Sequence, residues 1–330
     1  MIRFDELLGQ DRVVDALRRS IAANRVAHAY LFEGIPGCGR RTTAMALIAT
    51  LFCHQPTADG ACGSCPSCKK LAAGNHPDLH LLEPLPDKRD ISIEQVRELQ
   101  QMLSLRPFEA KRKACLIEPA ERMSVGAANS LLKTLEEPPG HGLLILLTSQ
   151  ADLLLPTVRS RCQHLRFAPL GIDDLTSLLV RQGMTPDNAA TLAPLAEGSL
   201  ALARDLKEED ASTSRQVLLD ALRQVRHQQV ATVFDTSERL AGGRNEALEL
   251  FAQLISLLRD MLLLRSAAPD RIANVSLEGR LHEEADRFLP ARLMEALELA
   301  IETRRAIQGN VNPKLALDRY LLRYSRLRIT

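Results

Sequence analysis

The chain has 330 residues, 45% of them hydrophobic and 25% charged, a composition typical of a soluble globular protein of two or three domains at roughly 150 residues each. Its 42 Lys and Arg residues almost balance 41 Asp and Glu residues, and aromatic residues make up only 3% with no Trp. A net charge of +1 and so few aromatic rings argue against a chain that wraps nucleic acid unaided or stacks single-stranded bases.

The sequence carries no recognisable export or membrane signal. Residues 1–6 contain acidic side chains where a secretory signal needs an apolar run. The apolar stretch 143–147 is far shorter than the ~20 residues that cross a bilayer. Seven cysteines, an odd number, fit poorly with the fully paired disulfide framework of a secreted protein. We therefore expect a cytoplasmic protein.

The first half of the chain alternates short apolar runs with helical patterns. The apolar runs predict five strands, at residues 29–33, 78–83, 112–118, 142–148 and 163–167. Helical periodicity between the strands predicts helices at 40–52, 93–103 and 124–135. Strands that alternate with helices indicate an α/β fold with a parallel sheet covered on both faces.

Beyond Pro169 the pattern becomes almost entirely helical. Amphipathic periodicity predicts helices at 173–182, 187–196, 214–226, 245–265, 290–308 and 314–327. The second half of the chain is therefore expected to be all-helical.

A glycine-rich loop, Gly34-Ile35-Pro36-Gly37-Cys38-Gly39-Arg40-Arg41, lies between the first predicted strand and the first predicted helix. Its spacing matches a phosphate-binding P-loop, in which glycines admit backbone N–H groups to the phosphates, a Lys reaches the β and γ phosphates and a hydroxyl holds Mg²⁺. Gly34, Gly37 and Gly39 are present, but Arg40 replaces the Lys and Arg41 replaces the hydroxyl. Arg41 cannot bind a cation, and Arg40 is not interchangeable with Lys at a tight site.

The second half of a nucleotide site is also incomplete. At the end of the strand predicted at 112–118, where an ATPase carries Asp and Glu for Mg²⁺ and water, this chain has Glu118-Pro119. We therefore expect a degenerate P-loop that does not hydrolyse ATP and does not hold it. Weak nucleotide binding to the glycine loop is the alternative, and a titration of the chain with ATP and Mg²⁺ separates the two.

Four cysteines, Cys53, Cys62, Cys65 and Cys68, follow the first predicted helix with the spacing C-x8-C-x2-C-x2-C. Two consecutive x2 spacings fold a knuckle that directs its sulfurs to one point, and four thiolates complete a tetrahedral Zn²⁺ site with no open position for catalysis. The pattern predicts a structural zinc. An iron–sulfur cluster is the competing interpretation, because four cysteines can also hold one.

A further candidate is Arg161, in the segment Ser160-Arg161-Cys162 that follows the strand predicted at 142–148. An Arg that projects from a domain edge can enter the nucleotide site of a neighbouring subunit and stabilise charge on the transferring phosphoryl group. The tripeptide alone is a weak signal, since one Arg among 42 basic residues is usually a solvated surface group. The position of Arg161 after the strand predicted at 142–148 makes it a stronger candidate.

Several short motifs occur in an order that resembles the bacterial clamp-loader subunits of the AAA+ class. They are Leu8-Gly9-Gln10, the segment 28–34 (HAYLFEG), the four-cysteine insertion, Asn75-His76-Pro77-Asp78, the segment 131–139 (LLKTLEEPP) and Ser160-Arg161-Cys162. Each motif is modest, but their combination is specific. The resemblance covers about half of the chain and implies an AAA+ P-loop domain.

Departures from the family pattern point to a particular kind of subunit. The motor subunits of that family, gamma and tau, keep an intact Gly-Lys-Ser/Thr and Asp-Glu, which this chain has lost. It also has Gly198-Ser199-Leu200-Ala201 where the motor pattern is Gly-Ser-x-Arg. The resemblance therefore implies a non-hydrolysing stator, not an enzyme on its own, in which Arg161 matches the arginine finger that acts in trans.

Two other functions fit the sequence less well. An active ATPase motor is opposed by Arg40 and Arg41, where Lys followed by Thr or Ser would favour it. A stand-alone zinc-dependent DNA-binding module is opposed by the balanced charge and the few aromatic residues.

The resemblance also implies partners and a domain plan. The partners are the gamma/tau motor subunits and the delta subunit of the DNA polymerase III clamp loader, and through the complex the sliding clamp and primed DNA. At the level of the holoenzyme the activity is DNA-directed DNA polymerisation. Residues 1–167 are expected to form the AAA+ α/β domain with the zinc module at 53–68, residues 168–207 a helical lid, and residues 208–330 a helical collar for oligomerisation.

Overall fold

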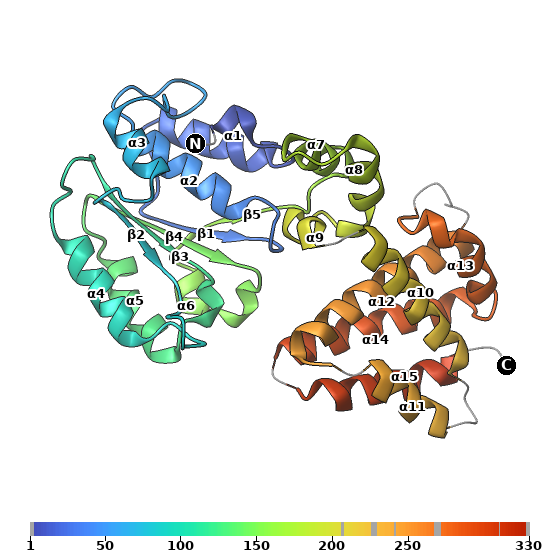
Figure 1. The fold of residues 1–330 in the computed structure, drawn as a ribbon. Coiled ribbons are helices and arrows are strands. Elements are labelled where there is room, and N and C mark those ends of the chain that lie inside the picture. Colours follow the sequence, from blue (N-terminus) through green and yellow to red (C-terminus); the bar gives the residue numbers. More distant parts are fainter. Residues whose placement is uncertain are drawn as a thin grey trace. The chain divides into compact units, whose positions relative to one another are not determined.

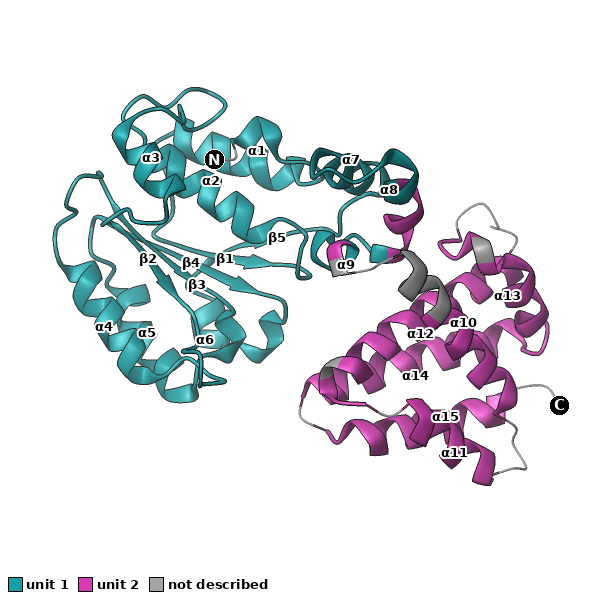
Figure 2. Cartoon of the chain, viewed as in Figure 1, with its two compact units in different colours: residues 1–189, 196–203 teal, residues 190–195, 204–330 magenta. Residues whose placement is uncertain are grey.

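The computed structural model describes residues 3–205, 208–225, 230–240, 242–266, 272–309 and 311–327 (Figure 1). The chain divides into two compact units, residues 1–189 with 196–203 and residues 190–195 with 204–330 (Figure 2). Most of the predicted lid, residues 168–189 and 196–203, belongs to the first unit. The predicted boundary at residue 207 lies outside the described residues, and the three-domain plan stays a prediction.

A five-stranded parallel sheet forms the centre of the first unit (Figure 1). Its strands are β1 (Ala29–Glu33), β2 (Leu79–Leu82), β3 (Lys113–Ile117), β4 (Gly142–Thr148) and β5 (Gln163–Arg166), in the order β2-β3-β4-β1-β5. All five predicted strands are present, and the parallel α/β fold is confirmed.

The central strands are mostly apolar because helices cover both faces of the sheet. Every residue of β3 and β4 is buried. Along β4, Leu143, Ile145 and Leu147 pack into one core and Leu144 and Leu146 into the other. Successive residues of a strand point to opposite faces, so one continuous apolar run supplies both cores.

The helices of the first unit lie in two layers, with α1, α2 and α3 on one side of the sheet and α4 and α5 on the other (Figure 1). Their bounds are α1 (Asp11–Ala22), α2 (Arg40–Phe52), α3 (Pro66–Ala72), α4 (Ile93–Ser104), α5 (Val125–Glu136), α6 (Pro156–Arg159), α7 (Ile172–Arg181), α8 (Pro186–Leu192) and α9 (Leu200–Asp205). The three helices predicted between strands, α2, α4 and α5, are confirmed. Ser92 begins α4 with a capping box, because its hydroxyl accepts from the Gln95 amide and the Gln95 side chain accepts from the Ser92 amide.

Among its described residues, the second unit has helices joined by short loops and no strand. Its longer elements are α10 (Glu208–Gln224), α11 (Val230–Leu240), α12 (Arg244–Arg265), α13 (Glu278–Ala285), α14 (Pro290–Gln308) and α15 (Pro313–Leu327). Its core contains Phe251, Phe288, Tyr320 and Tyr324, and the ring of Phe251 meets that of Tyr320 edge-on at 5.3 Å. The all-helical prediction is confirmed for these residues, although residue 226, the predicted end of one helix, lies outside them. None of the described helices is both long and apolar enough to cross a membrane.

Candidate functional site

The glycine loop connects β1 to α2, as the P-loop spacing predicts. Gly37 and Gly39 have φ of 77° and 102°, a backbone conformation that favours glycine. A Cβ atom at Gly37 would lie 2.5 Å from the amide nitrogen of Ala201, so only glycine fits this close approach. The loop is also tied to the rest of the unit by Gln10, whose amide donates to the carbonyls of Cys38 (3.1 Å) and Ala168 (2.7 Å).

The segment that starts α9 lies directly against the glycine loop. The Leu200 amide donates to the Gly37 carbonyl at 3.1 Å, and the Ser199 hydroxyl donates to the Pro36 carbonyl at 2.8 Å. The carbonyls of Pro36 and Gly37 therefore already accept hydrogen bonds from the segment that starts α9. The residue beside Gly37 is Ala201, the position at which the sequence lacks an Arg.

The two arginines of the loop have different surroundings. Arg40, the first residue of α2, is buried with 9% of its surface exposed. Arg41 is half-exposed, and its guanidinium lies 2.5 Å from the Glu83 carboxylate and 2.9 Å from the Glu118 carboxylate. Burial alone would lower the pKa of Arg41, but hydrogen bonds to these two carboxylates raise it above its usual value.

This ion pair joins three distant parts of the chain at the carboxyl ends of the strands. Glu83 and Glu118 each follow directly on a strand, β2 and β3, and these strands are neighbours in the sheet. Glu118 is the carboxylate that sequence analysis found at the incomplete nucleotide site. Its partner is now a guanidinium from the protein, located where a P-loop would supply a hydroxyl for Mg²⁺.

The polar residues at the end of β4 also form hydrogen bonds within the protein. Ser149, the residue after β4, donates to one oxygen of the Glu121 carboxylate from its amide (3.1 Å) and from its hydroxyl (2.6 Å). The neighbouring Thr148 is fully buried, and its hydroxyl accepts from the Gln150 amide. The polar groups at this strand end thus bond to one another.

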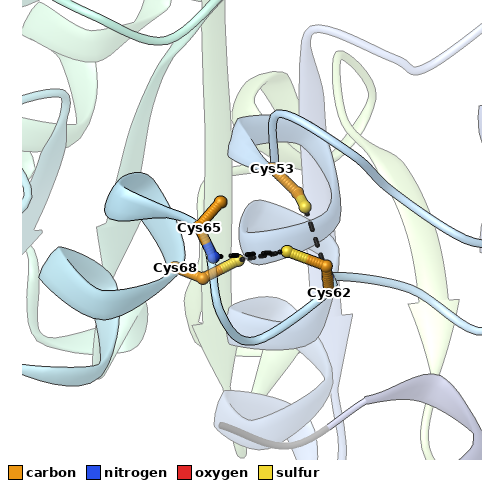
Figure 3. Close-up of side chains that lie close together, drawn as sticks. All are labelled: Cys53, Cys62, Cys65 and Cys68. Carbon is orange, nitrogen blue, oxygen red and sulfur yellow. Dashed lines mark hydrogen bonds between the residues drawn. The ribbon is translucent and has the colours of Figure 1, made fainter.

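The four cysteines, which run from the end of α2 into α3, are brought together as predicted (Figure 3). All four sulfurs lie within 4.8 Å of one another, and those of Cys62 and Cys68 are 4.0 Å apart. A tetrahedral zinc with Zn–S bonds of about 2.3 Å spaces its sulfurs about 3.8 Å apart. The donor set and its spacing therefore fit a metal ion bound by four cysteines.

Backbone amides donate hydrogen bonds to two sulfurs of this cluster, and such bonds favour the thiolate form. The Cys62 amide donates to the Cys53 sulfur at 3.2 Å, and the Cys65 amide donates to the Cys62 sulfur at 3.4 Å. Backbone N–H groups of Ser64 and Cys65 lower the pKa of Cys62 to about 6, whereas burial raises that of Cys68 to about 12. The surroundings of these two cysteines therefore shift their thiol pKa values in opposite directions.

A partly buried polar network, which the sequence did not predict, anchors the helix that carries Cys68. His76 lies 3.0 Å from the Ser67 hydroxyl and 3.0 Å from the Glu109 carboxylate, which also pairs with Lys70. Ser67 and Lys70 belong to α3, and Glu109 belongs to the loop before β3. The network joins the cysteine module to the sheet.

Asp78 completes this anchor from inside. Its carboxylate is fully buried and accepts from the amides of Phe108 (2.6 Å), Glu109 (2.9 Å) and Ala110 (2.8 Å). The motif Asn75-His76-Pro77-Asp78 therefore has a folding role.

Arg161 lies after α6, and its guanidinium contacts Glu136, the last residue of α5. Its Nη2 is 2.7 Å from a Glu136 carboxylate oxygen, and its Nη1 donates to the Thr157 carbonyl at 3.0 Å. The Arg161 side chain remains 36% exposed. Val158 of α6 packs into the core shared with α4 and α5, whereas α2 and the glycine loop belong to the opposite core.

Two family models of DNA polymerase III match the chain. The model described as "DNA polymerase III, delta subunit" matches residues 9–171, and "DNA polymerase III, delta subunit, C terminal" matches residues 209–326. The two matches together span both compact units.

Individual relatives agree with these models. The DNA polymerase III subunit delta' of Bacillus subtilis (strain 168) is 31% identical over 95% of this chain and 95% of its own length. The delta' subunit of Escherichia coli (strain K12) is 31% identical over 94% and 92%. The DNA polymerase III subunit gamma/tau of Mycobacterium tuberculosis (strain ATCC 25618 / H37Rv) is 27% identical over 96% of this chain and 59% of its own length.

Proposed function

The chain belongs to the family of DNA polymerase III delta' subunits, and on that premise we propose that it is the non-hydrolysing member of a clamp loader and supplies Arg161 to the ATP site of a neighbouring motor subunit. The observation that carries this proposal is the ion pair of Arg41 with Glu118 and Glu83. Where a hydrolysing subunit needs a divalent cation, this chain has a guanidinium of its own.

Coordination chemistry explains why that replacement opposes hydrolysis. Mg²⁺ bridges the β and γ phosphates and neutralises the charge that develops on the transferred group. A guanidinium is always protonated and offers only donors, so it cannot coordinate phosphate and water oxygens as a metal does.

The surroundings of Arg161 support a role in trans. Arg161 follows α6, on the face of the sheet opposite α2, and it is partly exposed. A guanidinium at this position is available to a neighbouring subunit. An arginine finger supplied in trans stabilises transition-state charge and is worth on the order of 10³ or more in rate.

The remaining parts of the proposal concern the complex. The partners are the gamma/tau motor subunits and the delta subunit, which together open a sliding clamp and load it on primed DNA with ATP bound by the motor subunits. In this proposal residues 1–167 form the AAA+ domain, residues 168–207 form a helical lid that lies mostly in the first unit, and residues 208–330 form the collar. We assign zinc to the four cysteines as a structural metal, because all four positions around it are filled by the protein.

The test is ATP turnover by a complex reconstituted from this chain with its motor and delta subunits. Arg161→Ala is expected to leave assembly intact and to lower the stimulated rate by about 10³-fold. Arg159→Ala is the matched control, since Arg159 lies two residues away, is similarly exposed and pairs with Asp152. Equal rates for the two variants would refute the role of Arg161.

A further inference from the structure

Arg161 is held in place by contacts on two sides before any partner is present. The Nη2 atom of Arg161 pairs with the carboxylate of Glu136 at the end of α5, and its Nη1 donates to the carbonyl of Thr157 in α6. Ser160 adds a contact of 3.5 Å between its hydroxyl and Nη1. A guanidinium has five N–H donors, and these contacts use at most three of them. The remaining donors can bind phosphate oxygens while the side chain stays anchored.

The position of Glu136 is unfavourable for its own helix. Glu136 is the last residue of α5, and the carbonyl end of a helix carries partial negative charge that disfavours a carboxylate. Pairing with Arg161 offsets that repulsion. The pair is half-exposed, and exposed ion pairs contribute little to stability, so the fold has little need of it. The Glu136 carboxylate is therefore better explained by what it does for the Arg161 guanidinium than by a contribution to folding.

We propose that Glu136 is the positioning residue for Arg161, a step that rests on the function proposed above. Glu136 fixes the guanidinium in one orientation before the neighbouring ATP site forms around it. Arg has many rotamers, and fixing one beforehand removes an entropic cost from the transition state. The effect acts on the transition state, and therefore on turnover more than on ATP affinity.

Three variants at two positions test this in the reconstituted complex. Glu136→Ala is expected to lower kcat for stimulated ATP hydrolysis about tenfold, with KM for ATP and assembly unchanged. Glu136→Gln keeps an acceptor oxygen and is expected to stay within about threefold of the unmodified chain. Glu137→Ala is the matched control, because Glu137 is exposed, adjacent and carries the same charge. It is expected to have no effect.

The double variant Glu136→Ala/Arg161→Ala shows whether Glu136 acts through Arg161. A positioning residue has nothing to add once the finger is gone, so the double variant should equal Arg161→Ala alone. Equal rates for Glu136→Ala and Glu137→Ala, a faster Glu136→Ala, or a further loss in the double variant would each overturn the inference and leave the role of Arg161 standing. No effect of Arg161→Ala would overturn the proposed function and this inference with it.

Discussion

The Arg41 guanidinium lies 2.9 Å from the Glu118 carboxylate, although the two residues are 77 positions apart in the sequence. The same guanidinium reaches Glu83, so two acidic side chains at adjacent strand ends share one basic partner. Without Arg41, the Glu83 and Glu118 carboxylates would lie close together with no cation between them. Whether an added metal ion then stabilises the protein tests whether Arg41 takes the place of Mg²⁺.

Arg41→Thr is expected to give the first unit a dependence on Mg²⁺ that the unmodified chain lacks. The substitution introduces a hydroxyl and removes the partner of Glu83 and Glu118. Repulsion between these two carboxylates is expected to lower the free energy of unfolding by about 1 kcal/mol. Millimolar Mg²⁺ should recover this loss as a rise in Tm. Thermal unfolding with and without Mg²⁺ measures it.

The double variant Arg41→Thr/Glu83→Gln provides the control. It retains the new hydroxyl but only one carboxylate, so its Tm should no longer rise with Mg²⁺. A Mg²⁺ response in the unmodified chain equal to that of Arg41→Thr would contradict the replacement of the metal by Arg41.

The elements that could be predicted from the sequence are those bounded by local signals. The strand Gly142–Thr148 and the helix Arg40–Phe52 were predicted with their observed bounds. The strand is a continuous apolar run, which burial on both faces requires. The helix α3 was not predicted, because its seven residues depend on the cysteine cluster and on His76 beyond it, and show no periodicity of their own.

The candidate sites divide in the same way. The cysteines and the glycines could be found because their spacing along the chain determines their geometry. The partners of Arg41 and Arg161 could not, since Glu83 lies 42 residues from Arg41 and the contact depends on the order of strands in the sheet. Glu136 belongs to a recognisable motif, but nothing in that motif indicates which residue its carboxylate meets.

Metal content tests the cysteine cluster. The purified chain is expected to contain one zinc, and Cys65→Ser to lose it, because a hydroxyl does not replace a thiolate as a zinc ligand. Elemental analysis by mass spectrometry measures both. Cys162→Ser is the control, since Cys162 lies outside the cluster and should keep full zinc. Iron in place of zinc would identify an iron–sulfur site instead.

Zinc affinity should rise with pH, because the shifted pKa values of Cys62 and Cys68 mean that protons compete with zinc for these sulfurs. Metal binding needs thiolates, and the pKa of about 12 for Cys68 in the metal-free chain means that a proton must leave this sulfur at neutral pH. Cys62, with a pKa of about 6, is already ionised above that pH and takes up a competing proton below it. The pH dependence of affinity should therefore steepen below pH 6. Competition with a chelator at several pH values measures this, and an affinity independent of pH would contradict it.

Asp78→Ala should loosen the anchor between the cysteine module and the sheet. The substitution leaves the backbone amides of Phe108, Glu109 and Ala110 without their acceptor. An unpaired donor costs roughly 1–3 kcal/mol, and these bonds are only partly buried, so the low end applies and the total cost is about 3 kcal/mol. Hydrogen exchange at these three amides measures the loss as faster exchange at pH 7. Asp87→Asn, at an exposed position, is the control and should leave the rates unchanged.

Acid should remove the same stabilisation from the unmodified chain. Burial would raise the pKa of Asp78, but the three backbone amides outweigh it and hold this pKa below the ordinary value of 3.8. A depressed pKa in the folded state gives stability that is complete above the unfolded pKa and is lost as pH falls through the folded one. The difference in unfolding free energy between the unmodified chain and Asp78→Ala should therefore stay constant from pH 7 to pH 5 and shrink below about pH 4. A difference that persists unchanged at pH 2 would mean that packing, and not the carboxylate, makes the anchor.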